Sequence, residues 1–437
     1  MPVTVVRHEP VVEAMSWASA RALAAGANRP LEPVLAPFSE ALGCRLAEPL
    51  RALVAVPGVD VSAMDGYAVA GPGPWRVAGQ VLAGGAPFGA ELRPGEAVEI
   101  ATGAPTPVGA EAVLPYEQAV AATAPVPRAR GQAEPVWVDG VVEAGRHIRR
   151  RGEDVAEGAV VLEAGAVVTP VALGLAAGLG HDELLVRPRP RVTVLVTGDE
   201  VVHRGLPEPG RVRDAIGPFL PGLVEWAGGR VTGTLRLPDG PEPLFAALGA
   251  PGEAPLTGEP TGGTPASVAF AGGTPVVPAR AAPGDVLVVC GASSKGPADH
   301  LRKVLEGLGA DVLVDGVAVR PGHPQLLARL PDGRLVVGLP GNPFAALAAA
   351  LTLLVPIVRA SAGTPARKET SALAGEVRTH PHNTRLVPVR RSARGAVPVG
   401  HDRPGSLWGA ALADALAVVP PGWAGDHIEL IELPPGG

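Results

Sequence analysis

The chain has 437 residues, enough for about two to four domains of ordinary size. It carries 37 Lys and Arg against 43 Asp and Glu, and the formal net charge of −6 excludes a global basic field that would hold nucleic acid. Only Cys44 and Cys290 are present, too few for a disulfide framework or a thiolate metal cage. Composition therefore favours a turn-rich globular protein of a reducing compartment, which we expect to be cytoplasmic and to bind small molecules.

The N-terminus and the longest apolar stretch predict neither export nor a membrane partner. The first ten residues, MPVTVVRHEP, carry charges and a proline where a secretion signal needs an unbroken apolar run. The longest uncharged run, 335–358, is interrupted by Pro340, Asn342 and Pro343, which leaves less than the roughly 20 apolar residues that a bilayer requires. We expect this run to contain a buried helix.

Hydrophobic periodicity divides the first half of the chain into three parts. Apolar residues at helical spacing predict helices over 11–26 and 37–52. Over 69–142, short apolar runs broken by Gly and Pro every few residues predict a small β domain. A helical pattern returns within 158–187, where we expect the chain to fold back onto its first helices.

The second half of the chain alternates strand and helix patterns. Strands are expected at RVTVLVT, GRVTGTLRL, DVLVVCG, DVLVDGVAV and RLVVGL, an alternation typical of a parallel sheet covered by helices. The stretch 249–284 is rich in Gly, Pro, Thr and Ala and predicts a turn-rich insert. From Glu376 onward, EVRTH, RLVPVRR, AVPVG, ALAVVPPG and HIELIEL predict short strands of a C-terminal barrel or sandwich.

Loops that follow the strands of an open α/β sheet are candidate sites, because ligands bind beyond the carboxyl ends of the strands. The strand RVTVLVT ends in Asp199 and Glu200, whose carboxylates predict either a Mg²⁺ site or the first turn of a helix. The loop ASSKGPADH contains Ser294, Lys295 and Asp299. It predicts either a phosphate site or a plain turn capped by Asp299, and it lacks the spacing of a P-loop.

Three further segments have competing interpretations. In GLPGNP, Asn342 is expected to cap a helix that begins at Pro343, with ligand binding as an addition. Asp65, in SAMDGYAV, is either a solvated turn residue or an exposed functional acid. The segment RHIRRRGEDV, 146–155, is either a salt-bridge cluster or an anion-binding surface. The histidines show no metal-ligand spacing, and no GxSxG nucleophile elbow is present.

Six strings, in one order along nearly the whole chain, resemble a single enzyme family. They are SAMDGYAV, EIATGAPTPVGAEAVLPYE, RRRGEDVAEGAVVLEAG, RVTVLVTGDEV, VRPGHP and GLPGNP. They resemble the molybdopterin molybdenumtransferases, bacterial molybdenum-insertion enzymes of molybdenum cofactor biosynthesis that are related to the C-terminal domain of gephyrin. The resemblance implies an elongated homodimer with a multidomain fold, α/β plus β.

The resemblance also implies four domains with definite boundaries. A segmented helical dimerisation domain is expected over 8–52 and 143–187, and a small β domain over 53–142. A three-layer αβα molybdopterin-binding domain is expected over 188–362, and a C-terminal β-barrel over 363–437.

The implied reaction takes adenylylated molybdopterin and molybdate, cleaves the phosphoanhydride with Mg²⁺ and releases AMP. Such chemistry needs carboxylates for a divalent cation, donors for phosphates and cations for an oxyanion. Matching positions imply catalytic roles for Asp65, Asp154, Glu200 and Asp299, three of which, Asp65, Glu200 and Asp299, are implied metal ligands. Implied substrate contacts are Thr102, Asp214, Asp239, Ser294, Lys295, Arg320, His323, Pro340, Gly341, Asn342 and Ser406. The adenylyltransferase of the same pathway is a further implied partner.

This sequence departs from the family pattern at three places. The usual GGVSVG loop reads CGASSKG at 290–296, and the usual DTN or DSN string reads DAI at 214–216. The two lysines around PGKP are replaced by Arg320 and His323, and a neutral imidazole is a poorer partner for an oxyanion than lysine. These departures motivate a rival hypothesis, a catalytically impaired paralogue that binds pterin or scaffolds partners.

Overall fold

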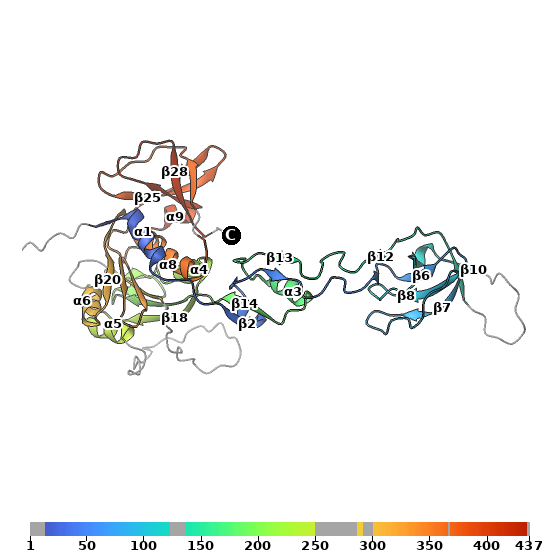
Figure 1. The fold of residues 1–437 in the computed structure, drawn as a ribbon. Helices are drawn as coiled ribbons and strands as arrows, with labels where there is room; N and C mark the ends of the chain where they lie inside the picture. The colour runs from blue at the N-terminus through green and yellow to red at the C-terminus, as the bar shows by residue number, and fades with distance from the viewer. Residues whose placement is uncertain (1–13, 123–135, 250–285, 292–299, 366–367, 435–437) are drawn as a thin grey trace, which may run out of the picture. The chain divides into compact units, whose positions relative to one another are not determined.

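The computed structural model describes residues 14–122, 136–249, 286–291, 300–365 and 368–434. The insert expected over 249–284 lies, apart from its first residue, outside these ranges. The chain divides into two compact units (Figure 1). Unit 1 takes Met1–Val34, Gly43–Arg45 and Val186–Gly437, and unit 2 takes Leu35–Leu42 and Leu46–Leu185, so unit 2 is an insertion in the sequence of unit 1.

Unit 2 contains a β-sheet with the strand order β10-β11-β7-β8-β6-β9. Its strands are β6 (Gly66–Ala70), β7 (Trp75–Val81), β8 (Glu96–Ile100), β9 (Ala112–Pro115), β10 (Val120–Ala122) and β11 (Trp137–Asp139), and the 3-10 helix η1 (Tyr116–Gln118) follows β9. Alternate residues of β6 enter two different cores, Ala68 and Ala70 on one face and Val69 on the other. The β character expected for this region is confirmed.

The remainder of unit 2 consists of short paired strands and helices. Its elements are α2 (Phe38–Ala41), β4 (Leu50–Arg51), β5 (Val61–Ser62), β12 (Ile148–Arg149), β13 (Val160–Leu162) and α3 (Pro170–Gly178), with β5 paired to β12 and β4 to β13. Helix α3 confirms the helical pattern there, with the Thr169 side chain as its cap. The helix expected over 37–52 is wrong, because α2 is one turn long and the chain reverses at Gly43, with φ of +77°.

Short strands also lie where the sequence passes between the units: β2 (Val34–Pro37), β3 (Arg45–Leu46) and β14 (Glu183–Arg187).

In unit 1, the α/β sheet has the order β18-β15-β19-β23-β22-β20. Its strands are β15 (Arg191–Thr197), β18 (Arg230–Leu237), β19 (Val286–Cys290), β20 (Asp311–Asp315), β22 (Leu326–Arg329) and β23 (Leu335–Leu339). Strands β18, β15, β19 and β23 are parallel, as expected.

Two features of this sheet differ from the sequence-based prediction. Strand β22 was not expected, and it runs antiparallel to both β23 and β20. The string DVLVDGVAV does not form one strand, because Gly316, with φ of +85°, separates β20 from β21 (Val317–Arg320). Strand β21 then joins a different sheet. Only a residue without a Cβ adopts this backbone conformation readily, which explains the break.

Helices cover both faces of the α/β sheet (Figure 1). Val194 points into a core shared with α1 (Trp17–Gly26), α4 (Leu220–Trp226), α7 (Pro343–Ala349) and α8 (Val355–Ser361). The next residue, Leu195, points into a core shared with α5 (Pro241–Leu248) and α6 (Leu301–Gly307). Because both faces are buried, the strands read as continuous apolar runs rather than as alternating ones.

The apolar run that ends at Val358 forms the core helix of unit 1. Helix Pro343–Ser361 is long and apolar enough to cross a membrane, but 89% of its window is buried inside the protein, as the sequence predicts. Its middle, η2 (Ala350–Leu354), is a π-helix, and the Arg21 side chain donates to the Leu351 carbonyl there. The Trp17 indole donates to Thr352 Oγ1 over 3.1 Å, so α1 satisfies polar groups of the irregular turn.

The C-terminal sheet has the strand order β1-β21-β25-β27-β28-β24, and a further strand, β26, pairs with β25. Its further elements are β1 (Met15–Ser16), β24 (Glu369–Ala372), β25 (Thr384–Ser392), β26 (Gly395–Pro398), α9 (Trp408–Leu412), β27 (Ala415–Val419) and β28 (His427–Glu432). An isolated bridge joins Leu373, just after β24, to Ala396 in β26. The strand expected at EVRTH, 376–380, is wrong: these residues form no strand, and the His380 ring accepts the N–H groups of His382 and Asn383 in the turn that leads into β25.

Candidate functional site

The carboxyl ends of the four parallel strands lie at one edge of the α/β sheet, and neighbouring ends are joined by hydrogen bonds. The Thr197 hydroxyl donates to the Cys290 carbonyl over 2.9 Å, and the Gly291 N–H donates to the Leu339 carbonyl over 3.1 Å. The loops that carry Glu200, Asp239 and Pro340–Asn342 start at this edge. Ser294, Lys295 and Asp299, which follow β19, lie outside the described residues.

Asp199 and Asp239, from the loops after β15 and β18, form reciprocal hydrogen bonds between the backbone N–H of one residue and the carboxylate of the other. The Asp199 N–H donates to Asp239 Oδ2 over 3.1 Å, and the Asp239 N–H donates to Asp199 Oδ1 over 3.3 Å. Glu200 is exposed beside them. The alternative that Asp199 and Glu200 begin a helix is wrong, because the short strands β16 (Val201–Val202) and β17 (Val212–Arg213) follow instead.

Asp214 is half-buried, and its carboxylate is engaged by its own loop. Its Oδ1 accepts the N–H groups of Ile216 and Gly217 over 3.0 and 2.9 Å, and its Oδ2 lies 3.2 Å from His203 Nδ1. Ile216, at a position where the family pattern has Asn, is 7% exposed and packs in the core that contains α4. Burial, and secondarily the Asp214 charge, raise the pKa of the Cys290 thiol, so this cysteine is an inert core residue.

The start of α7 is capped by a distant carbonyl, not by the residue that the sequence indicates. Asn342 occupies the N-cap position, but its side chain makes no capping bond, which corrects the predicted role. The Pro404 carbonyl instead accepts the N–H groups of Phe344 and Ala345, over 2.9 and 3.4 Å. Asn342 therefore remains exposed, and its side chain is available to a ligand.

Ser406 lies in the loop that provides this cap. A Cβ at the neighbouring Gly405 would lie 3.8 Å from Asn342 Oδ1, so the two loops are adjacent. The Ser406 hydroxyl accepts the Trp408 N–H over 3.2 Å. The structure thus brings Ser406 to the Pro340–Gly341–Asn342 turn, although the serine lies far from this turn in the sequence.

Arg320 is the last residue of β21, and His323 lies in the turn that follows it. The turn packs on α7, since a Cβ at Gly322 would lie 3.0 Å from the Ala345 carbonyl oxygen. His323 Nδ1 is 2.7 Å from the Val317 carbonyl, which can only accept, so this nitrogen carries a proton. Arg320 is exposed and stands opposite Arg385 in the parallel pairing of β21 with β25. These two predicted anion-binding residues therefore lie near the first turns of α7.

In unit 2, Asp65 is held at the surface by Thr102. Its Oδ1 accepts the Thr102 N–H over 2.7 Å and the Thr102 hydroxyl over 3.0 Å, while within the described chain its Oδ2 accepts no hydrogen bond. The turn is braced by Ser62, which is 1% exposed and whose hydroxyl donates to the Met64 carbonyl over 2.5 Å. This geometry leaves one carboxylate oxygen directed to solvent and available to a ligand.

Sequence reasoning missed an aromatic pair beside Asp65. The rings of Tyr67 and Tyr116 meet edge to face, with centroids 5.3 Å apart, and the Tyr116 hydroxyl donates to Glu99 over 2.7 Å. Burial, the bond to Glu99 and nearby charges raise the pKa of Tyr116, so it stays a neutral phenol. The chain has only 2 tyrosines, Tyr67 in SAMDGYAV and Tyr116 in LPYE. Both therefore stand in strings that the resemblance singles out, and this was the signal that could have indicated the pair.

The arginine-rich segment of unit 2 forms ion pairs. Arg149 pairs with Asp154, Arg150 with Asp60 over 2.6 Å, and Arg151 with Glu157 over 2.8 Å. The salt-bridge alternative therefore describes Arg149, Arg150 and Arg151. Asp154, a predicted catalytic residue, is exposed and engaged by Arg149.

We predict that Asp60 makes the stability of unit 2 sensitive to acid. The Arg151 N–H and the Arg150 side chain hold the pKa of Asp60 below its ordinary value of 3.8. Its contribution is therefore present above that value and is lost as the pH falls through the lower, folded-state pKa. Asp60→Asn should cost about 1 kcal/mol or less at pH 7, since the side chain is 36% exposed. Urea unfolding of wild type and variant from about pH 7 to about pH 3 should show this difference shrinking; a constant difference would contradict the prediction.

No group of three or more His, Cys, Asp or Glu that could hold a metal ion occurs among the described residues. This finding does not test Asp65, Glu200 and Asp299 as metal ligands, because Asp299 lies outside the described residues and the other two belong to different units. Mg²⁺ in proteins is commonly held by one or two carboxylates together with substrate phosphates and water. Exposed Glu200, beside Asp199 and Asp239, fits that kind of site.

Comparisons with known proteins find two family models that match successive parts of the chain. The model "MoeA N-terminal region (domain I and II)" matches residues 10–180, and "Probable molybdopterin binding domain" matches residues 275–360. These matches define a protein of the MoeA class that carries a molybdopterin-binding domain. Two solved MoeA structures from Pyrococcus horikoshii have the same fold. One has a TM-score of 0.67 at 24% identity and covers 96% of this chain and 98% of that chain; the other has a TM-score of 0.62 at 20% identity and covers 96% of this chain and 100% of that chain.

Curated relatives specify the family. Molybdopterin molybdenumtransferase 2 of Mycobacterium tuberculosis is 34% identical over 353 residues, which are 77% of this chain and 77% of the relative. The molybdopterin molybdenumtransferase of Synechococcus elongatus is 34% identical over 357 residues, 77% of this chain and 78% of the relative. The chain belongs to the molybdopterin molybdenumtransferase family.

Proposed function

We propose that this protein is a transferase of molybdenum cofactor biosynthesis that inserts molybdate into adenylylated molybdopterin, with Mg²⁺-dependent release of AMP. Membership of the family supports the transferase activity. The observation that carries the assignment of the site is the meeting of three loops around α7: Pro340–Asn342, the Pro404–Ser406 loop, and the turn of Arg320 and His323. The rival, an impaired paralogue, is not favoured, because the curated relatives are named as transferases.

The described residues divide the work of the reaction by their chemistry. Arg320 and His323 supply positive charge or N–H donors for an oxyanion, and Asn342 and Ser406 supply neutral donors beside them. Glu200, Asp199 and Asp239 form an acidic edge at the ends of β15 and β18. Bound Mg²⁺ would shield phosphate charge at that edge, with Glu200, Asp65 and Asp299 as its proposed ligands. Asp154, Thr102, Asp214, Ser294, Lys295, Pro340 and Gly341 complete the proposed set.

The four-domain layout is also part of the proposal, with the boundaries expected from the sequence. Closure of 363–437 into a β-barrel is supported by the bridge between Leu373 and Ala396. The bridge joins the end of β24, the last strand in the order, to β26, which pairs with β25. The N–H of Ala374 also donates to the Ala396 carbonyl over 2.8 Å. A cytoplasmic location and the pathway's adenylyltransferase as a partner remain proposals that follow from the family.

A homodimer through unit 2 is supported by apolar side chains on its surface. Val171, on α3, is 81% exposed, Val167 is 43% exposed, and Leu53 and Val54 are 54% and 46% exposed. Large exposed apolar side chains can form part of an interface. A symmetric dimer would bury the same patch on both subunits.

We predict that the dimer shares its site between subunits, with Asp65 of one subunit serving Glu200 of its partner. Asp65→Asn and Glu200→Gln should each be nearly inactive alone. Random mixing after denaturation and refolding should restore roughly a quarter of the wild-type rate of AMP release, because half of the dimers are mixed and each has one intact site. Mixing each variant with itself is the control. If the refolded mixture of the two variants releases no AMP above the controls, both acids act within one subunit or lie outside the site.

A second test concerns the departure at His323. If the site binds an oxyanion, His323→Lys supplies the positively charged lysine that the family usually has at this position. The variant should therefore retain or raise molybdate-stimulated AMP release. The matched control is Arg320→Lys, which keeps a charge at the neighbouring position. A rate of zero in the wild type, with adenylylated molybdopterin still bound, would replace the transferase assignment by the pterin-binding rival.

A further inference from the structure

Ser62, the last residue of β5, connects the two loops that carry Asp65 and Thr102. Its backbone N–H donates to the Ala104 carbonyl over 3.0 Å, and its own carbonyl accepts the Gly103 N–H over 2.8 Å. Strand β5 also pairs with β12. The main chain of Ser62 therefore fixes the loop that contains Thr102 against the strand that leads to Asp65.

The Ser62 side chain holds the turn that follows. Its hydroxyl donates to the Met64 carbonyl over 2.5 Å and accepts the Met64 N–H over 3.3 Å. A serine hydroxyl that bonds to the main chain two residues further on stabilises a compact turn. Ser62 is 1% exposed, so the hydroxyl acts from the interior of unit 2, where water has little access. The peptide group that follows Met64 is thus held from within the unit.

The bond from Ser62 lies one peptide group away from the Asp65 side chain. The Met64 carbonyl and the Asp65 N–H belong to the same planar peptide, so the orientation of this peptide affects the direction in which the Asp65 side chain leaves the chain. Asp65 Oδ1 meets both the N–H and the hydroxyl of Thr102, over 2.7 and 3.0 Å. On the other side, the Asp65 carbonyl accepts the Tyr116 N–H over the longer distance of 3.3 Å.

We propose that Ser62 is a positioning residue of the reaction, whose hydroxyl holds Asp65 and Thr102 in one geometry and thereby sets the rate at which Asp65 acts. This inference rests on the proposed function, in which Asp65 acts on the substrate. Ser62 is buried and acts only through the turn. A misplacement of about 1 Å can lower a catalytic rate about a hundredfold, so loosening this turn should affect the reaction step more than substrate binding.

The test compares Ser62→Ala, Asp65→Asn and the double variant by single-turnover release of AMP, in the full-length protein with adenylylated molybdopterin, molybdate and Mg²⁺. Ser62→Ala should lower the maximal rate about ten- to a hundredfold, and it should change the substrate concentration for half-maximal rate by less than about threefold. In the Asp65→Asn background the same change should lower the rate by less than about threefold, because the charge that Ser62 positions is already absent.

Hydrogen exchange provides a measurement that does not depend on turnover. The Thr102 amide donates to Asp65 Oδ1, so it should exchange about three- to tenfold faster in Ser62→Ala, while the amides of β6 and β8 stay as in the wild type. Thr106→Val is the matched control, since the Thr106 hydroxyl donates to the Asp60 carbonyl over 3.1 Å, outside the Asp65 turn. This control should match the wild type in AMP release and in Thr102 exchange.

Three results would overturn the proposal. They are a wild-type rate in Ser62→Ala, an equal loss of rate from this change in both backgrounds, and unchanged exchange of the Thr102 amide. Failure of the proposed function looks different, because a wild type that released no AMP would remove that function, whereas Thr102 exchange would still decide whether Ser62 holds Asp65. If Ser62→Ala does not fold, Ser62→Cys, which is nearly isosteric and a weaker donor, replaces it in both measurements.

Discussion

Asp65→Asn should lower the rate of AMP release about a hundred- to a thousandfold, the effect of removing one group that acts on the charges of a transition state. The substitution is nearly isosteric. Asn retains a carbonyl oxygen that can accept the two Thr102 bonds of 2.7 and 3.0 Å, so the turn should keep its shape. What is removed is the negative charge, half of which is directed to solvent on Oδ2. The expected loss is therefore in the chemical step rather than in folding.

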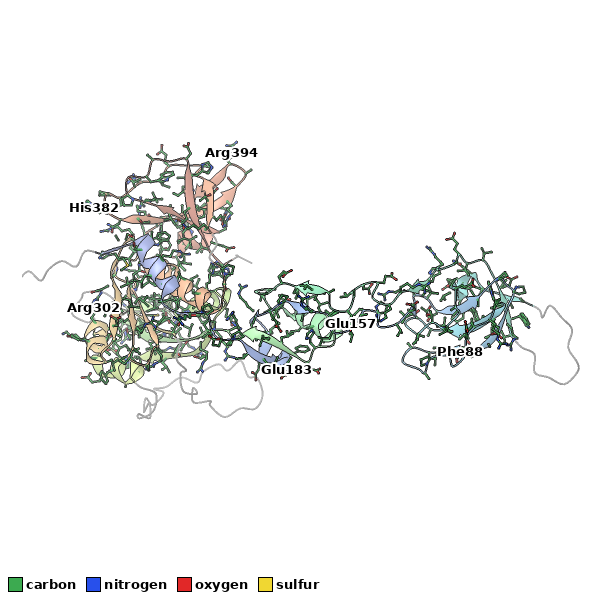
Figure 2. All side chains as sticks on the ribbon, in the orientation of Figure 1. Phe88, Glu157, Glu183, Arg302, His382 and Arg394 are labelled. Atoms are coloured by element: carbon green, nitrogen blue, oxygen red, sulfur yellow. The ribbon has the colours of Figure 1, made fainter. Side chains whose placement is uncertain are left out.

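Single-turnover release of AMP from adenylylated molybdopterin, with molybdate and Mg²⁺ present, measures that step directly. Glu157→Gln is the matched control, because Glu157 is an exposed acid of the same unit whose pair with Arg151 is worth about 0–1 kcal/mol (Figure 2). Hydrogen exchange at β6 would establish that the variant is folded. A rate within about tenfold of wild type would remove Asp65 from the catalytic set.

Phe344→Ala should destabilise unit 1 by about 3–5 kcal/mol. Phe344 has 0% exposure in the core that contains α1, α4 and the faces of β15, β19 and β23, so truncation leaves a cavity where the core helix begins. Its backbone N–H is also one of the two donors capped by Pro404. The same substitution at Phe245, which is 47% exposed on α5, should change stability by about 0.5 kcal/mol or less.

Hydrogen exchange followed by mass spectrometry resolves the two units within the whole chain. Amides of β15 and β19 should exchange faster in Phe344→Ala at a given urea concentration, while those of β6 and β8 in unit 2 should be unchanged. Equal acceleration in both units would mean that they unfold together. An effect no larger than that of Phe245→Ala would contradict the packing described for α7.

The sequence predicts the four parallel strands of the α/β sheet, most clearly β15, β19 and β23, which are apolar runs between polar turns. β15 and β19 are buried on both faces, and burying each side chain of this size contributes about 1.5–3 kcal/mol, a bias that local propensity does not override. The short elements are predicted poorly. The segment 37–52 has helical spacing, yet Gly43 adopts a positive φ and the helix stops after one turn.

For the candidate site, the sequence indicates residues but not the hydrogen bonds that they make. Asp65, Thr102 and Asn342 lie in the strings that carry the resemblance, and the structure pairs Asp65 with Thr102. The cap of α7 was not predictable, because its acceptor is the main-chain carbonyl of Pro404, and every residue has a carbonyl. The same limitation hid the reciprocal bonds of Asp199 and Asp239, in which backbone N–H groups are the donors.

Strand β21 has a consequence for synthesis of the chain on the ribosome. It receives β1, Met15–Ser16, on one side and β25, from the last part of the chain, on the other. Its full complement of neighbours exists only after residue 392 has emerged, and unit 2 has by then been translated in between. In newborn chains β1 must therefore stay unpaired while unit 2 and the segment up to β21 are translated, and β21 then keeps one edge open until β25 emerges. These intervals are when the chains most need protection from pairing with one another.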